Sequence, residues 1–138
     1  MYRIEKKGFG LRLTFGGVIP PEEMAQWVED FRRELTEMTA PFHIFVDMRT
    51  LVPLNREAQV HMEEGQRLAR EHGLGRSVVI FRSPVTEAQF RRIGGATGIA
   101  RGERYVNACE EPDWETVGLD WLLKEIEPAR QRLFVADR

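Results

Sequence analysis

The stretch HIFVDMRTLVPLNREAQ, residues 43–59, decides the fold because it joins a buried strand to a helix through a short loop. With Phe42 before it, its first part is a nearly continuous apolar run, which is typical of a central strand covered on both faces. Pro53 lies in the loop, and Asn55 is a favourable N-cap for a helix that extends to about His72. The stretch therefore predicts one strand–loop–helix unit.

The residues before this unit predict a β-hairpin and then an amphipathic helix. Apolar residues alternate through the second half of YRIEKKGFGLRLTF, residues 2–15, and Gly8 suits a tight turn. Pro20 and Pro21 open the helix, where a missing N–H costs little. Its apolar residues recur at three- and four-residue steps as one stripe: Met24, Trp27, Val28, Phe31, Leu35 and Met38.

The residues after the unit repeat the strand–helix pattern twice. RSVVIFRS, residues 76–83, is a second buried strand, and Ser83 caps a third helix that begins at Pro84. RYVNA, residues 104–108, is a shorter strand. A final helix follows Pro112 and Asp113. The second helix should turn small and apolar residues inward and so approach the sheet closely: Ala58, Met62, Gly65 and Ala69, with Leu68 on the flank.

This order, ββαβαβαβα, predicts an α/β fold with a single mixed, mostly parallel sheet of about five strands. The N-terminal β-hairpin adds an antiparallel strand at one edge, and about four helices pack against the sheet. We expect one domain over residues 1–127 and a C-terminal tail over residues 128–138. An exposed hairpin strand would also permit a homodimer.

The composition is that of an ordinary globular domain. The 138 residues are 42% hydrophobic and 30% charged, with a formal net charge of -2. This balance gives no basic signature of a nucleic-acid partner. The single cysteine, Cys109, leaves no internal disulfide and fits a reducing compartment. The chain shows neither a signal peptide nor an apolar run long enough to span a bilayer, so we expect a cytoplasmic protein.

Asp47 and Arg49 follow the apolar run directly, and Ser83 follows the next strand. Ligands of open α/β sheets bind beyond the carboxyl ends of the strands, so these side chains could share one site. The alternative is that a buried strand simply reaches water there, with Asp47 capping the loop. An enzyme would need Asp47 paired with a second titratable group, which the sequence does not provide.

Other polar features predict no cofactor and no metal. His43, His61 and His72 lack the spacing of convergent metal ligands, and the acidic neighbours of Cys109 disfavour a reactive thiolate. GGATGIARG, residues 94–102, lacks the ending of a phosphate loop. Nearby arginines form either a basic patch for an acidic partner or an ordinary charged face: Arg91, Arg92, Arg101 and Arg104.

The order of elements, FVDMRTL before a loop and helix, and RSVVIFRSPVTEAQFRRIGGATGI together resemble a known family over roughly residues 2–127. The chain is similar to the STAS domains, and more closely to SpoIIAA-like proteins of the STAS and SEC14-like type. The resemblance implies a bacterial, non-enzymatic domain that works by binding a partner protein. The family's switch serine, however, has no counterpart in VPLNREA, residues 52–58, and the nearest hydroxyl belongs to Thr50.

We therefore expect a partner protein to dock at the carboxyl ends of the strands. The residues proposed for this contact are Asp47, Arg49, Thr50, Asn55, Arg56 and Ser83. The alternative that the resemblance implies is a small apolar ligand or lipid, held between helices and sheet. Its pocket would be lined by Met24, Trp27, Met38 and Met62, which are equally suitable as core.

Overall fold

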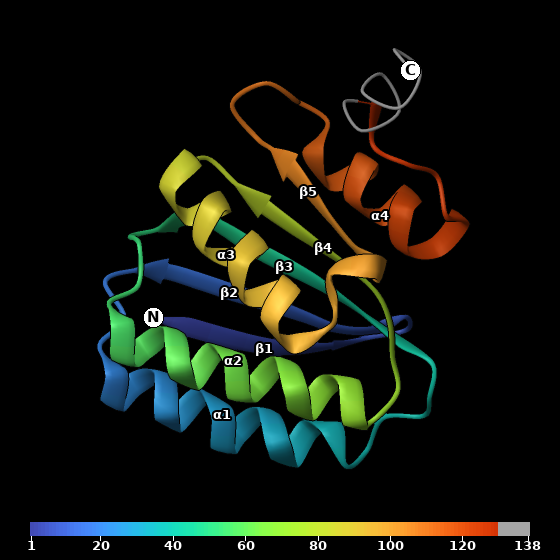
Figure 1. The fold of residues 1–138 in the computed structure, drawn as a ribbon. Coiled ribbons are helices and arrows are strands. Elements are labelled where there is room, and N and C mark those ends of the chain that lie inside the picture. The colour runs from blue at the N-terminus through green and yellow to red at the C-terminus, as the bar shows by residue number, and fades with distance from the viewer. Residues whose placement is uncertain (130–138) are drawn as a thin grey trace.

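The computed structural model of the protein describes residues 1–129, which form one five-stranded sheet with helices on both faces (Figure 1). The strands are β1 (Tyr2–Lys7), β2 (Gly10–Gly17), β3 (Phe42–Leu51), β4 (Leu74–Phe81) and β5 (Glu103–Asn107). The helices are α1 (Pro21–Leu35), α2 (Arg56–Glu71), α3 (Pro84–Thr97) and α4 (Trp114–Lys124), with a short turn η1 (Ala100–Gly102) before β5. The predicted fold class and element order are confirmed.

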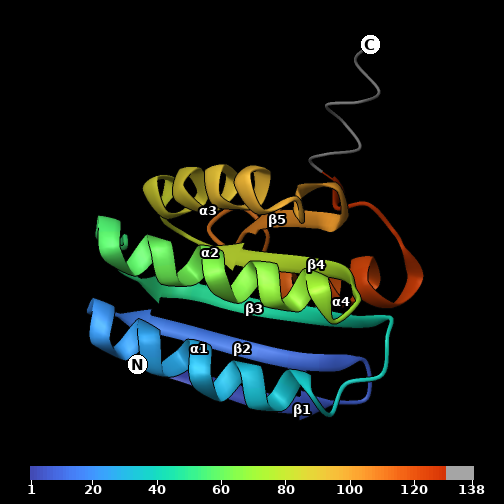
Figure 2. The same cartoon turned by 60° about the horizontal axis from the view of Figure 1, so that its bottom comes forward.

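The strands lie side by side in chain order, β1-β2-β3-β4-β5. Only the hairpin pair β1–β2 is antiparallel, and the other three pairs are parallel. Each helix connects one strand to the next parallel strand, always moving in the same direction across the sheet. Because such connections are right-handed, the connecting helices all lie on one face of the sheet. Figure 2 shows this arrangement, with α1, α2 and α3 on one face of the sheet and α4 on the other.

Two separate cores follow from this layering. The larger core lies between the sheet and α1, α2 and α3, and it includes Phe15, Trp27 and Phe90. The smaller core lies under α4 and includes Phe45 and Trp121. β3 contributes to both cores because its successive side chains point to opposite faces, which explains its nearly continuous apolar sequence.

The predicted helix starts are confirmed in detail. The side chain of Asn55 accepts a hydrogen bond from the backbone N–H of Ala58 at 2.9 Å, and α2 begins one residue later. Ser83 caps α3 in the same way, accepting from the N–H of Thr86 at 3.3 Å. The predicted inward residues of α2 are buried as well: Ala58, Met62, Gly65 and Ala69.

Two element ends differ from the predictions. α1 ends at Leu35, so Met38 lies beyond the helix, half-buried against the larger core. β3 continues to Leu51, because Thr50 and Leu51 pair with Gly16 and Gly17 of β2 across a register shift. Asp47 and Arg49 therefore lie within the strand and not at its exit. Residues 130–138 of the predicted tail lie outside the described residues.

β1 forms one edge of the sheet, as the expected homodimer would require. It carries Arg3, Lys6 and Lys7, and charged side chains on an edge strand oppose pairing with another chain. The homodimer stays a prediction.

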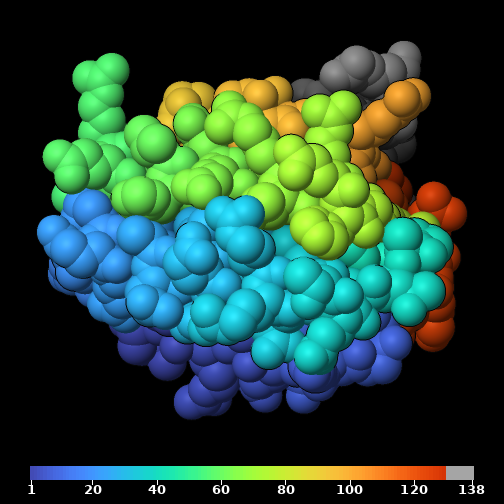
Figure 3. Space-filling view, turned by 90° about the horizontal axis from the view of Figure 1, so that it is seen from below, coloured from blue at the N-terminus to red at the C-terminus, as the bar shows by residue number. Residues whose placement is uncertain are grey.

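A glycine allows α1 and α2 to pack closely. The two helices lie side by side, and in Figure 3 their atoms form a continuous surface. The indole of Trp27 stacks on Phe31 with ring centroids 4.8 Å apart. It lies against Gly65 of α2, where an added Cβ would approach the indole to 2.3 Å.

We expect Gly65→Ala to lower the free energy of unfolding by up to about 2 kcal/mol. The overpacking cost of about 1–3 kcal/mol outweighs the roughly 1 kcal/mol gained in helix propensity. Gly95→Ala is the matched control, because Gly95 is an exposed glycine within α3 and nothing lies near its added Cβ. The control should be stabilised by up to about 1 kcal/mol. Urea unfolding measures both, and a stabilised Gly65→Ala protein would contradict this close packing.

Candidate functional site

The carboxyl ends of β2, β3 and β4 form one edge of the sheet, which lies at the left in Figure 1. The loops into α1, α2 and α3 meet there. The N–H of Val52 donates to the carbonyl of Gly17 at 3.0 Å, which ties the first loop to the second. Gln89 of α3 bonds both the N–H and the carbonyl of Leu54, at 2.9 Å each, which ties the second loop to α3. The edge is therefore a connected and ordered surface.

Apolar side chains gather at this edge. Within residues 1–129, seven large hydrophobic side chains are exposed, and four of them lie there: Met1, Val18, Val52 and Val85. Val18 is 71% exposed, Val52 46% and Val85 57%. Each valine comes from a different loop or helix start, and the hydrogen bonds described above hold those segments together. The edge thus presents separate apolar contact points on a fixed frame.

The six predicted contact residues divide into two groups. Thr50, Asn55, Arg56 and Ser83 lie at the carboxyl edge, where Asn55 and Ser83 also cap helices. Asp47 and Arg49 lie instead on the sheet face covered by α4, since they alternate with the inward-facing Met48. The six predicted contact residues therefore do not all lie on one surface.

Asp47 and Arg49 form a bidentate ion pair within one strand. Arg49 donates from Nε and Nη2 to the two carboxylate oxygens of Asp47, at 3.0 Å each, and from its backbone N–H at 3.1 Å. Its guanidinium lies 4.0 Å from the ring centroid of Trp114 on α4. The hydrogen bond to Asp47 raises the pKa of Arg49 above its ordinary value. Because the guanidinium of Arg49 stays protonated, the pair does not form an acid–base couple. It instead holds Arg49 against Trp114 and so helps to fix α4 on the sheet.

The predicted apolar pocket is mostly filled. Met24, Trp27 and Met62 are buried in the larger core. The cavity beside Trp27 and Met62 has a volume of about 40 Å³. Small-molecule sites usually measure roughly 300–1,000 Å³, so this space suits water and not an acyl chain.

A buried carboxyl group lines the same cavity. Glu103 accepts a hydrogen bond from Ser77 Oγ at 3.0 Å and a second, short one from the hydroxyl of Tyr105. Burial raises the pKa of Glu103 to about 7, although these hydrogen bonds and Arg91, whose guanidinium lies over the ring of Tyr105, oppose the shift. Burial and the nearby Glu103 also raise the pKa of Tyr105. Sequence reasoning missed Glu103 because a glutamate between Gly102 and Arg104 is typical of an exposed segment.

The pKa of Glu103 predicts how stability depends on pH. Between pH 4.5 and about 7 the folded state binds a proton that the unfolded state has released, so stability falls as pH rises through this window. The whole effect amounts to about 3 kcal/mol. We expect Glu103→Gln to remove this pH dependence. Relative to wild type, the variant's free energy of unfolding in urea should therefore rise by about 3 kcal/mol between pH 4.5 and pH 8. A difference that stays constant with pH would contradict a proton on Glu103.

The predicted basic patch is divided between two places. On α3, Arg91 donates to Glu87 at 2.9 Å, and Arg92 donates to Glu63 of α2 at 3.4 Å. Arg101 and Arg104 lie at the opposite, amino edge of the sheet, in a cleft that also contains Arg70 and Arg76.

No protein-family model, curated protein or solved structure matches this chain at a significant level. The STAS resemblance therefore stays a prediction. In the part of the chain that the structure describes, no group of three or more His, Cys, Asp or Glu side chains is placed to hold a metal ion. None of the helices within residues 1–129 is long and apolar enough to cross a membrane.

Proposed function

We propose that this chain is a non-enzymatic binding domain that docks a partner protein through the carboxyl edge of its sheet. The observation that carries the proposal is the exposure of three valines from three connected segments. We call the surface formed by Val18, Val52, Asn55, Arg56 and Val85 the docking edge. Single exposed apolar residues are ordinary on soluble proteins, but their concentration at one ordered edge is not.

The docking edge has the composition of a protein interface. Its apolar contact points would form the dry centre, and Asn55 and Arg56 at the start of α2 would contribute to the polar rim. The hydrogen bonds among Gly17, Val52, Leu54 and Gln89 fix the loops before binding, so little entropy is lost on association. The geometry favours docking over carriage of an apolar ligand, because the cavity near Trp27 and Met62 is far smaller than such a ligand.

The test is quantitative recovery of bound protein by the immobilised chain from a lysate of its native source. We expect Val52→Asp and Val85→Asp each to reduce recovery of the same partner at least tenfold, because a charge at the centre of an interface must lose its water. Leu123→Asp is the matched control, since Leu123 is 55% exposed on α4, away from the docking edge. Equal recovery with all three variants, or no partner above bare resin, would contradict the proposal.

An alanine scan of the six predicted contact residues separates docking from structural roles. Arg56→Ala should weaken recovery without changing the melting temperature, because Arg56 is exposed. Asn55→Ala and Ser83→Ala each remove a helix cap and should cost about 1 kcal/mol of stability, so their effects must be read at matched folded fractions. Asp47→Ala should destabilise the fold and leave partner recovery by the folded fraction unchanged. If only Asp47→Ala abolished recovery, the interface would lie on the sheet face covered by α4 and not at the docking edge.

A further inference from the structure

We infer that the chain has a second binding site, a cleft at the amino edge of the sheet that binds a small phosphorylated molecule. The cleft has a volume of about 590 Å³, which is within the range of small-molecule sites. It lies where β4 and β5 begin and includes residues from η1 and from the ends of α2 and α4. We call it the arginine cleft, after the charged residues that line it: Arg70, Arg76, Arg101, Arg104, Glu125 and Glu127.

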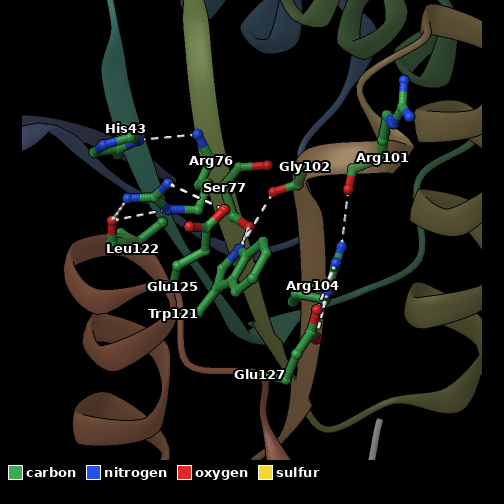
Figure 4. A network of polar contacts seen from close by, with 10 residues as sticks. All are labelled: His43, Arg76, Ser77, Arg101, Gly102, Arg104, Trp121, Leu122, Glu125 and Glu127. Atoms are coloured by element: carbon green, nitrogen blue, oxygen red, sulfur yellow. Dashed lines mark hydrogen bonds and ion pairs between the residues drawn. The ribbon is translucent and has the colours of Figure 1, made fainter. Parts of the chain in front are cut away.

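Two of the arginines are fixed in place by several hydrogen bonds, as Figure 4 shows. Arg76 donates from Nε and Nη2 to the carbonyl of Leu122, at 3.1 and 2.8 Å. Arg104 donates to both carboxylate oxygens of Glu127, at 2.6 and 2.7 Å, and to the carbonyl of Arg101 at 3.0 Å. The guanidinium groups of Arg76 and Arg104 therefore line the base of the cleft in fixed positions. Most of their N–H donors are already used within the protein.

The wall behind them is also fixed. The indole N–H of Trp121 donates to the carbonyls of Ser77 and Gly102, at 3.0 and 3.2 Å. The guanidinium of Arg104 lies 4.1 Å from its ring centroid. The N–H of Arg76 donates to Nδ1 of His43 at 2.9 Å, which anchors the start of β4. The cleft thus keeps its shape without a ligand.

The other two arginines have donors to spare. Arg70 makes one long hydrogen bond, 3.4 Å, to the carbonyl of Thr97, and its guanidinium lies against Gly98, where an added Cβ would come within 2.5 Å. The side chain of Arg101 is exposed, and within residues 1–129 it has no hydrogen bond or ion pair. These two side chains come from different elements and line the same cleft.

The charge balance shows that internal compensation does not use all of the positive charge. Four arginines and two glutamates leave a net charge of +2 in the cleft. Arg70 and Arg76 neutralise the carboxyl ends of α3 and α4, each equivalent to about half a negative charge. A surplus of roughly one positive charge remains, and Arg101, which has no partner within residues 1–129, carries it.

A phosphate group fits this surplus better than a carboxylate does. Its three terminal oxygens can accept hydrogen bonds from two separate guanidinium forks, whereas a carboxylate is already satisfied by one. Arginine also binds phosphate in a bidentate way that lysine does not match. The side chains of Arg70 and Arg101 would donate to the phosphate, and Arg76 and Arg104, which are paired with Glu125 and Glu127, would hold the shape of the cleft around it.

The test is a titration of the isotopically labelled full chain with phenyl phosphate, followed by two-dimensional NMR. We expect saturable shifts at the indole N–H of Trp121 and at the amides of Gly98 and Gly102. Benzoate, which offers a carboxylate on the same ring, should bind at least tenfold more weakly. Inorganic phosphate should shift the same signals, which would show that the phosphate group itself is recognised.

Matched variants locate the site. Arg101→Gln should weaken phenyl phosphate binding about tenfold, because it removes one charge-assisted fork. Arg92→Gln should leave binding unchanged, since Arg92 is paired with Glu63 and Gln59 outside the cleft. Both residues are exposed, and an unchanged melting temperature confirms that each variant is folded. The inference is overturned by shifts that do not saturate, by equal binding of benzoate, or by an Arg101→Gln variant that binds like wild type. None of these results bears on the docking edge, which lies at the other end of the strands.

Discussion

The structure depends on one topological constraint, the adjacency in space of strands that are consecutive in the chain. Because each helix connects one parallel strand to the next, α1, α2 and α3 all run along the same face, antiparallel to strands β2 to β5. Helix N-termini therefore collect at one edge and helix C-termini at the other. Asn55 and Ser83 satisfy free N–H groups at the first edge, and Arg70 and Arg76 satisfy free carbonyls at the second. The different chemistry of the two edges follows from this single order of strands.

The opposite face explains the pair at the centre of the opening stretch. α4 is the only described helix there, and it packs on β3, β4 and β5, so the core beneath it has an open side toward β2. Arg12 lies over the ring of Phe45 at 4.7 Å, and Arg49 lies over Trp114 at 4.0 Å. Their aliphatic stems and planar heads cover the apolar border while the charges reach water. Asp47 orients Arg49 for this purpose. The pair that the sequence placed at the end of a strand therefore covers the open side of the smaller core under α4.

Features that depend on local periodicity could be predicted from the sequence, and features that depend on pairing could not. The caps of α2 and α3 follow from Asn55 and from Ser83 before Pro84, because capping needs only near neighbours. The end of β3 depends on Gly16 and Gly17 of another strand, so nothing after Asp47 reveals it. The arginines of the arginine cleft come from α2, β4, η1 and β5, and no spacing rule connects Arg70 to Arg104. Glu103 and Tyr105 did carry one usable signal, since they alternate with Arg104 and Val106 and so share a face.

α3, like α2, connects the two edges. Its first turn presents Val85 at the docking edge, and its last residue, Thr97, accepts a hydrogen bond from Arg70 beside the arginine cleft. Its middle lies over the buried carboxyl group, because the Tyr105 hydroxyl lies within hydrogen-bonding distance of both Glu103 and the carbonyl of Phe90 in this helix, the latter at 3.1 Å. A packed helix moves as a rigid body, since its internal hydrogen bonds resist bending more than its side-chain contacts resist sliding. A partner at the docking edge and a phosphorylated ligand in the arginine cleft would therefore contact opposite ends of α3. The titratable Glu103 lies beneath the middle of this helix.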